Sequence, residues 1–230
     1  VCLGHRRLSI IDTSDAGHQP FVSDCGRFVL VYNGELYNYR SIREELEKLG
    51  DVFRTESDTE VLINSFRRWG TECLPRLNGM FAFAVWDEAE KQLTLVRDRA
   101  GIKPLYFAKL GDELVFASEI KAILASKLIR AEIDHEGLNQ FLTFLWPVPP
   151  QTLFRGIKQL PPAHLLVWKD GEVSTREWWD LDYSIEDRET SETVWRERVL
   201  ETLDRSVEME MIADVPLGAF LSGGVDSSSI

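Results

Sequence analysis

Apolar and polar positions repeat along this chain with two different periods, and together they predict an α+β fold. Runs of β-branched and aromatic residues bounded by turn residues predict strands at 27–32, 80–86, 93–97, 105–108 and 114–117. A further hairpin is expected over residues 165–173. Many short strands separated by turns indicate two packed, mainly antiparallel sheets with helices on their flanks.

Helix starts are marked by two sequences of the capping-box type. Ser41-Ile42-Arg43-Glu44 predicts a helix that ends near Leu49, with Gly50 as its stop. Ser57-Asp58-Thr59-Glu60 predicts a second helix, which has apolar residues at helical spacing and ends at Gly70. Further helices are expected at 118–124, 136–146 and 194–211.

The ends of the chain suggest that it is part of a longer protein with two domains. Residues 1–3 resemble the middle of a strand, so we expect that a preceding segment is missing. Residues 182–191 are acidic, polar and poor in apolar residues, which is typical of a linker. We therefore expect one domain over residues 1–184 and the start of another over residues 192–230.

The last residues combine an apolar run with a glycine-rich loop. Residues 215–221 predict a strand, and Ser222-Gly223-Gly224 follows it, with Asp226 and Ser227 close behind. Two glycines allow backbone N–H groups to approach an anion, so this pattern predicts a phosphate-binding loop. It is not a Walker loop, because no Gly-Lys-Ser/Thr follows.

The amino-acid composition and net charge argue against some kinds of binding partner and cellular setting. The net charge is −12, which argues against a nucleic-acid partner, since such a partner requires a basic face. Apolar runs fall well short of the ~20 residues that a membrane helix needs. The three cysteines, an odd number at wide spacing, predict neither a disulfide framework nor a zinc site, and we expect a reducing, cytoplasmic setting.

Six motifs in a fixed order resemble the glutamine-hydrolysing asparagine synthetases. They occupy residues 5–10, 32–38, 57–60, 78–83, 97–106 and 222–228. The resemblance implies a class II glutamine amidotransferase domain with the N-terminal-nucleophile hydrolase fold. It also implies that the first helix and strand of an α/β ATP-pyrophosphatase domain follow.

The resemblance assigns roles in a glutamine site. A cysteine thiolate attacks the substrate amide, and Asn33 and Gly34 match the oxyanion hole. Arg7 matches the arginine that binds the α-carboxylate, and Asp58 matches the acid that binds the α-ammonium. The pocket is completed by Glu35 and by the backbone of Leu8, Ser9, Ile10 and Ile11.

The resemblance also assigns roles in a second site, where ATP activates the β-carboxylate of aspartate. Pyrophosphate would bind Ser222, Gly223, Gly224 and Ser227, with the Leu221 backbone near the nucleotide. Asp226 would help to hold Mg²⁺, which prefers oxygen ligands. Glutamine, aspartate and ATP are thus the implied small-molecule partners, and the resemblance also allows a homodimer.

Cys2 is not expected to be the nucleophile. It lies five residues before Arg7, whereas the family nucleophile stands well upstream of the His-Arg-Arg-Leu motif, on a separate strand. Because Cys25 and Cys73 match no family site either, we expect these 230 residues alone to hydrolyse no glutamine.

Simpler interpretations remain open for single residues. Asn33-Gly34 is more often only a hairpin turn, and Asp58 follows a predicted N-cap, where the helix dipole alone favours an acid. Arg7 beside Arg6 is compatible with a solvated pair on a strand, and Arg97-Asp98 with a simple ion pair.

Two other functions compete with asparagine synthesis. One is an amidotransferase of the same family with another acceptor, as in peptide, polysaccharide or β-lactam biosynthesis. The other is a non-catalytic module that keeps the glutaminase-like fold. The predicted glutamine pocket favours an enzyme that uses glutamine as its nitrogen donor. The Ser222 loop argues against a non-catalytic module, because such a module needs no ATP site.

Overall fold

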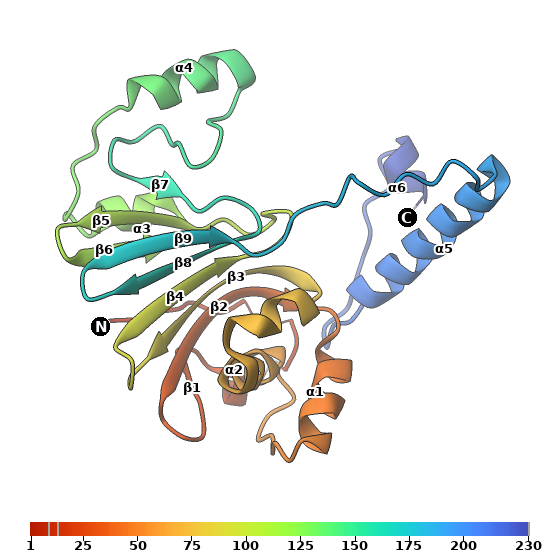
Figure 1. Ribbon diagram of the computed structural model, residues 1–230, viewed down its shortest axis with the longest axis horizontal. Coiled ribbons are helices and arrows are strands. Elements are labelled where there is room, and N and C mark those ends of the chain that lie inside the picture. Colours follow the sequence, from red (N-terminus) through yellow and green to blue (C-terminus); the bar gives the residue numbers. More distant parts are fainter. Residues whose placement is uncertain (9, 13, 230) are drawn as a thin grey trace.

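The computed structural model describes residues 1–8, 10–12 and 14–229 and contains two antiparallel sheets (Figure 1). The larger sheet has the strand order β1-β2-β3-β4-β8-β9, and the smaller has the order β6-β5-β7. The strands are β1 (Phe21–Val22), β2 (Phe28–Leu36), β3 (Gly79–Asp87), β4 (Gln92–Arg97), β5 (Tyr106–Leu110), β6 (Glu113–Ala117), β7 (Lys158–Gln159), β8 (His164–Lys169) and β9 (Glu172–Glu177). The predicted α+β fold and the predicted strands of the sheets are confirmed.

The helices flank the sheets or extend away from them. They are α1 (Tyr39–Lys48), α2 (Asp58–Trp69), α3 (Ile120–Ala125), α4 (His135–Phe144), α5 (Glu192–Glu210) and α6 (Val225–Ser229), with short 3₁₀ turns at Asp15–Gly17 and Gly70–Arg76. Figure 1 shows α1 and α2 on one face of the six-stranded sheet, and the smaller sheet on its other side. None of the helices in the described ranges is long and apolar enough to cross a membrane.

Successive side chains of β2 point to opposite faces of the sheet and contribute to two separate hydrophobic cores. Leu30 packs with Leu46 of α1 and Leu62 of α2 in the core beneath the helices. Val31, the next residue, faces the opposite way and belongs to the core between the two sheets, together with Phe107 of β5. A period of two thus makes β2 a central strand that is covered on both faces.

Ser57 caps α2 as predicted, although its N–H donates to the Thr55 hydroxyl and not to Glu60 as a capping box requires. The first predicted helix start is wrong. The Ser57 hydroxyl accepts a hydrogen bond from the Thr59 N–H, and α2 ends at Gly70. Helix α1 instead begins at Tyr39, so Ser41 lies inside it, where its hydroxyl donates to the carbonyl of Asn38. The chain already turns into the helix directly after β2, which the local capping pattern does not encode.

The alternative interpretation of Asn33-Gly34 as a hairpin turn is wrong. Both residues lie within β2, where Asn33 pairs with Ala82 and Gly34 pairs with Phe81 of β3. A Cβ atom on Gly34 would lie 2.7 Å from the Cα atom of Phe81, and closer still to the carbonyl oxygen of Met80. Glycine is therefore required here by close strand approach rather than by a turn.

Two expected terminal strands do not form in the described residues. Residues 1–8 and 215–221 form no strand, and Phe220 is fully exposed. An apolar run becomes a strand only when a neighbouring strand accepts its hydrogen bonds, and no strand in the described part of the chain pairs with either segment. The expected strand before Ser222 is therefore absent here, whereas the helix expected at 194–211 is present as α5.

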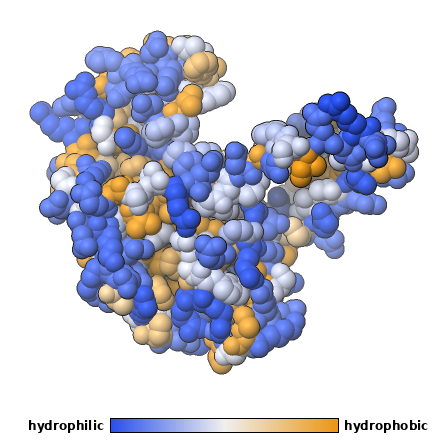
Figure 2. Space-filling model, viewed as in Figure 1, coloured by the Kyte–Doolittle hydropathy of each residue, from blue (hydrophilic) through white to orange (hydrophobic). Residues whose placement is uncertain are grey.

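Exposed apolar side chains concentrate away from the sheets. Leu142, Phe144, Leu145 and Trp146 are exposed around the end of α4 (Figure 2). Helix α5 has no buried residue, and Figure 1 shows it standing apart from the sheets, joined to them by extended chain. The lack of buried residues distinguishes α5 from the packed body formed by the two sheets and the helices that cover them.

Candidate functional site

One small pocket gathers residues that the sequence motifs assign to a glutamine site. It has a volume of about 120 Å³ and lies between the N-terminal segment, β2 and the start of α2. Its lining includes Arg7, Leu8, Ile10, Ile11, Asn33, Gly34, Glu35 and Asp58. Ser9 falls outside the described residues. All the other predicted glutamine-binding residues thus meet in one place, although they come from three separate motifs.

Asp58 is the buried acid of this pocket, with 4% of its surface exposed. Its Oδ2 atom accepts hydrogen bonds from the Tyr32 hydroxyl at 2.9 Å and from the Leu36 N–H at 3.0 Å. Burial raises the pKa of Asp58, although these hydrogen bonds and the charge of Arg7 oppose the shift. A buried carboxylate whose pKa is raised favours a cationic ligand, because such a ligand restores the charge balance.

Arg7 is held by the loop that follows it. Its Nη2 atom donates to the carbonyl of Ile11 at 2.5 Å, and its Nη1 atom donates to the carbonyl of Ser14 at 3.3 Å. A Cβ atom on Gly17 would lie 2.6 Å from the Cζ atom of Arg7, so glycine leaves room for the guanidinium group. Arg7 is therefore an oriented group and not a solvated neighbour of Arg6. A guanidinium has five donors, so others remain for a carboxylate.

Asn33 and Gly34 are presented at the edge of the pocket by β2. The Asn33 side-chain amide also approaches the Ser118 hydroxyl, with 3.5 Å between Nδ2 and Oγ. Because the two residues are consecutive in a strand, a side-chain amide and a backbone N–H are held in a fixed relation by the β2–β3 pairing. Fixed donors of this kind are what an oxyanion hole requires.

Glu35 and Lys103 give the lining of the pocket a mixed charge. Burial raises the pKa of Glu35, while Lys103 opposes that shift and Asp58 and Glu210 add to it. The pKa of Tyr37, two residues further along the chain, is raised to about 12 by burial and by Glu210. Glu210 is the last residue of α5, so this helix ends near the pocket.

The Arg97-Asp98 pair has a structural role different from a simple ion pair. Asp98 accepts hydrogen bonds from the N–H groups of Phe81, Ala100, Ile102 and Lys103. Arg97 donates to the carbonyls of Gly101, Lys103 and Leu160. The two side chains together fix the loop that brings Lys103 to the pocket.

Sequence reasoning missed several residues of the pocket, including Gln19, Thr59 and Lys103. Gln19 is 3% exposed, and its Oε1 atom accepts the Tyr32 N–H at 2.6 Å. Lys103 lies inside the motif at 97–106, and its place in that motif could have suggested a role in the pocket. Gln19 lies in a Gly/Pro-containing loop, and nothing local indicates that it reaches the strand edge.

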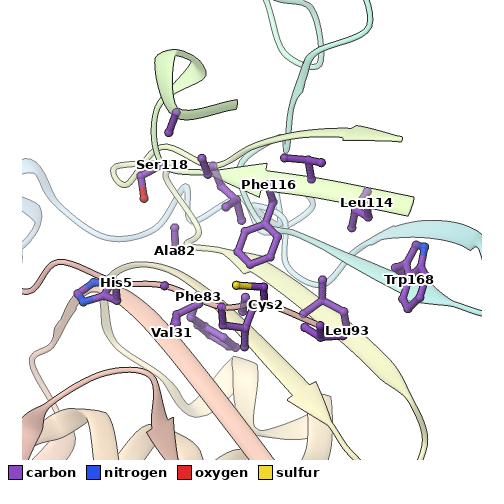
Figure 3. A pocket seen from close by; sticks show the side chains of 18 of the residues that line it. Cys2, His5, Val31, Ala82, Phe83, Leu93, Leu114, Phe116, Ser118 and Trp168 are labelled. Atoms are coloured by element: carbon purple, nitrogen blue, oxygen red, sulfur yellow. The ribbon is translucent and has the colours of Figure 1, made fainter. Parts of the chain in front are cut away.

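A larger cavity of about 1220 Å³ opens between the two sheets (Figure 3). Val31, Ala82 and Leu93 line one side and Leu114 and Phe116 line the other. It shares His5, Arg6, Tyr32 and Asn33 with the smaller pocket, so the two spaces adjoin. Cys2 lines this larger cavity and is not among the residues that line the smaller pocket.

The glycine-rich loop near the end of the chain is closed by its own hydroxyl groups. The Ser222 and Ser227 Oγ atoms lie 2.8 Å apart, and the Gly224 N–H donates to the Ser222 hydroxyl at 3.4 Å. Gly223 has a φ of +77°, a conformation that glycine adopts without strain. Leu221 is exposed, and Asp226 lies in the first turn of α6. No group of three or more His, Cys, Asp or Glu residues within the described ranges could hold a metal ion.

Two family models match the chain in succession. The model described as a glutamine amidotransferase domain matches residues 1–179, and the model described as asparagine synthase matches residues 198–230. The interval between them contains the acidic segment at 182–191.

Relatives with curated names align over the whole chain. Asparagine synthetases [glutamine-hydrolyzing] 3 and 1 of Bacillus subtilis are 40% and 38% identical over 100% of this chain. Amidase chry2 of Gibberella zeae is 38% identical over the same extent. The chain spans 38%, 36% and 34% of the lengths of these three relatives, respectively.

Solved structures are similar in fold. The glutamine phosphoribosylpyrophosphate amidotransferase of B. subtilis superposes with a TM-score of 0.54 at 24% identity, covering 76% of this chain and 34% of that one. A second structure, of an allosteric regulatory enzyme of purine biosynthesis, has a TM-score of 0.52 at 23% identity and covers 71% of this chain and 32% of that one. The sheets described above therefore form the N-terminal-nucleophile hydrolase fold.

Proposed function

Since residues 1–179 belong to the glutamine amidotransferase domain family and residues 198–230 match asparagine synthase, we propose that this chain serves glutamine-dependent asparagine synthesis. The complete protein would convert aspartate, glutamine and ATP to asparagine, glutamate, AMP and pyrophosphate. The two matches also support a division into domains at 1–184 and 192–230.

The observation that carries this proposal is the convergence of an oriented arginine and a buried acid on one pocket. Glutamine is a zwitterion at its α-carbon, so its recognition needs one group of each charge. We assign the α-carboxylate to Arg7, whose forked guanidinium matches it, and the α-ammonium to Asp58. Glu35 and the backbone of the segment from Leu8 to Ile11 complete the binding of the substrate.

The acyl-transfer step would use Asn33 and Gly34 as the oxyanion hole. A thiolate that attacks the side-chain amide places negative charge on its oxygen, and preorganised N–H donors stabilise that charge. Loss of one such donor typically slows the reaction by about 10²–10³-fold. The two residues are held by strand pairing, so they need no rearrangement as charge develops.

We propose that the thiolate does not come from Cys2. The lining of the glutamine pocket does not include Cys2, which supports the assignment. Residues 1–230 alone are then expected to release no glutamate from glutamine, while they still bind it. If glutamate is released and a Cys2→Ala variant abolishes the release, Cys2 is the nucleophile and the proposal is wrong.

The second site would bind ATP through the loop from Leu221 to Ser227. Hydroxyl groups and glycine N–H groups are suited to pyrophosphate, the leaving group when aspartate is adenylated. A single carboxylate, Asp226, is compatible with Mg²⁺, which is usually bound by one or two carboxylates together with substrate phosphates. The metal would therefore arrive with ATP rather than reside in the protein.

The test is to incubate the intact protein that contains this chain with ATP, Mg²⁺, aspartate and glutamine. Formation of asparagine and AMP in equal amounts supports the proposal. A matched reaction with ammonium in place of glutamine separates the synthetase step from glutamine use. Absence of glutamine binding to these residues, measured by calorimetry, would contradict the assigned pocket directly.

A second candidate keeps the glutamine pocket but changes the acceptor. This chain is 38% identical both to asparagine synthetase 1 of B. subtilis and to Amidase chry2, and this equal sequence identity supports the second candidate. In this case glutamine and ATP are consumed with another carboxylic acid, and aspartate supports no AMP release. Testing a panel of carboxylic acids in the same AMP assay distinguishes the two candidates.

A further inference from the structure

The segment between α5 and the Ser222 loop is bonded through Asp214 to the loop that contributes Ile10 and Ile11 to the glutamine pocket. The Asp214 N–H donates to the carbonyl of Ile10 at 3.0 Å. The N–H of Asp12 in turn donates to the Asp214 Oδ2 atom at 2.8 Å. Asp214 thus closes a two-bond clasp on the loop that lines the pocket, from a part of the chain 202 residues away in sequence.

The clasped loop is the one that orients Arg7. The carbonyls of Ile11 and Ser14 receive the two hydrogen bonds from the guanidinium group. Asp12 lies between these carbonyls, and its Oδ1 atom accepts the Ser14 N–H at 3.1 Å. Any shift of Asp12 is therefore passed to both of the carbonyls that fix the arginine.

The backbone at Asp12 has an uncommon conformation that is supported from outside the loop. Its φ is +50°, which is the left-handed region that non-glycine residues occupy only at a cost. The hydrogen bond that its N–H donates to Asp214 is one such support. A second anchor fixes the Asp214 side of the clasp, because Ile212 packs against the core beneath α1 and α2. Figure 1 shows the chain after α5 passing close to the start of α1, in agreement with this contact.

We propose that Asp214 is a positioning residue for glutamine recognition: it holds the backbone of Ile10 and Asp12 so that Arg7 is aimed at the substrate carboxylate. This inference rests on the proposed function and assigns part of the glutamine site to the segment that leads to the ATP loop. The same segment continues to Ser222, so the two sites are joined by a short stretch of chain.

The test compares Asp214→Ala with Asp214→Asn in the intact protein. Alanine removes the acceptor for the Asp12 N–H, whereas asparagine keeps an oxygen in the same place. We expect the alanine variant to raise the KM for glutamine about 3- to 10-fold, the effect of one exposed hydrogen bond, with kcat unchanged. The asparagine variant should restore the wild-type KM, and an Asp204→Ala variant on α5 serves as the matched surface control.

Ammonium-dependent synthesis shows whether the effect belongs to the glutamine site. The alanine variant should leave this activity unchanged, because ammonium does not use Arg7. An unchanged KM for glutamine, or an equal loss with glutamine and with ammonium, would overturn the inference while leaving the proposed function intact. A wild-type protein that neither binds nor uses glutamine would instead refute the proposed function.

Amide hydrogen exchange tests the clasp without any substitution. In the wild-type protein, saturating glutamine should slow the exchange of the Asp12 and Asp214 amides, because a bound carboxylate fixes Arg7 and hence the loop. Exchange that is the same with and without glutamine at both amides would overturn the inference, even if the alanine variant fails to fold.

Discussion

Replacing Asp58 with asparagine should separate substrate binding from folding. Both hydrogen bonds that Asp58 accepts from Tyr32 and Leu36 end on Oδ2. An asparagine carbonyl in the same place accepts both, and the carboxamide nitrogen takes the position of Oδ1. The variant therefore keeps these two hydrogen bonds but has no negative charge for the substrate ammonium group.

The expected loss of affinity follows from the kind of interaction that is removed. A hydrogen bond to a charged group contributes about 1.5–3 kcal/mol, which corresponds to roughly 10- to 150-fold in affinity. We therefore expect the KM for glutamine to rise by at least about tenfold, with ammonium-dependent activity unchanged.

The Asp58→Asn substitution should weaken glutamine binding without lowering the stability of the fold. Burial raises the pKa of Asp58 above its unfolded value, so the folded state binds the proton more tightly than the unfolded state does. Ionisation of this group thus opposes folding at pH values above its folded pKa, and the opposition fades as the pH falls through that value. The carboxamide of the Asp58→Asn variant cannot ionise, so the variant should be at least as stable as the wild type at neutral pH.

The pH dependence of glutamine binding gives a second signature. Binding needs the carboxylate, so the wild-type KM should rise as the pH falls through the raised pKa of Asp58. This rise should begin at a higher pH than for an ordinary aspartate, and the Asp58→Asn variant should lack it. Steady-state kinetics across pH and urea unfolding measure the two effects.

Glu60 supplies the matched control, since it is a buried acid in the same helix that does not line the pocket. Its Oε2 atom accepts the Thr55 N–H at 2.7 Å, and the Arg54 N–H is accepted by both carboxylate oxygens, by Oε1 at 3.1 Å and by Oε2 at 3.0 Å. A Glu60→Gln variant should lose about 1–3 kcal/mol of stability, because a carboxamide N–H must face a backbone donor, and keep its KM. If Asp58→Asn destabilises the protein like Glu60→Gln and leaves the KM unchanged, Asp58 is a structural acid and our reasoning is refuted.

Three further predictions test other parts of the structure. Gly34→Ala should lower the unfolding free energy by roughly 2–4 kcal/mol, because its Cβ would overlap the Met80 carbonyl oxygen and lie 2.7 Å from the Phe81 Cα atom. Gly218→Ala, which meets nothing within 4 Å, should not change that free energy in urea unfolding. The Cys73 thiol is fully buried, and burial raises its pKa to about 12, so it should resist thiol reagents at neutral pH until the protein unfolds. The exposed thiols of Cys2 and Cys25 should react in the folded protein. Rapid labelling of Cys73 in the folded protein would contradict this prediction. Ser227→Ala should reduce AMP formation but leave glutamine binding intact, and a reduced glutamine affinity in calorimetry would argue against two separate sites.

Local patterns were sufficient for several elements because burial follows the chain at short range. The apolar spacing and the Ser57 cap predicted α2, and the apolar runs at 80–86 and 93–97 predicted β3 and β4. These segments are covered by their neighbours in the way their own side chains require. The order of the six motifs likewise indicated the family before any contact was known.

Local patterns failed where a distant partner decides the conformation. Asn33-Gly34 has the composition of a turn, but β3 pairs with it and continues the strand. Residues 215–221 have the composition of a strand, yet no strand in the described ranges pairs with them. Glycine permits both a turn and a close strand approach, so only the neighbouring chain selects between them.

The sequence by itself determined the α+β class and most of the sheet strands, and its motifs suggested residues for a glutamine site. Only the tertiary structure decided that Gln19 and Lys103 join the pocket and that the carbonyls of Ile11 and Ser14 orient Arg7. It also decided that Asp214 bonds to Ile10 and Asp12. The physical reason is that periodicity reports which face of an element is buried, whereas hydrogen bonds between distant loops leave no periodic trace. Such contacts depend on where the whole chain places each loop.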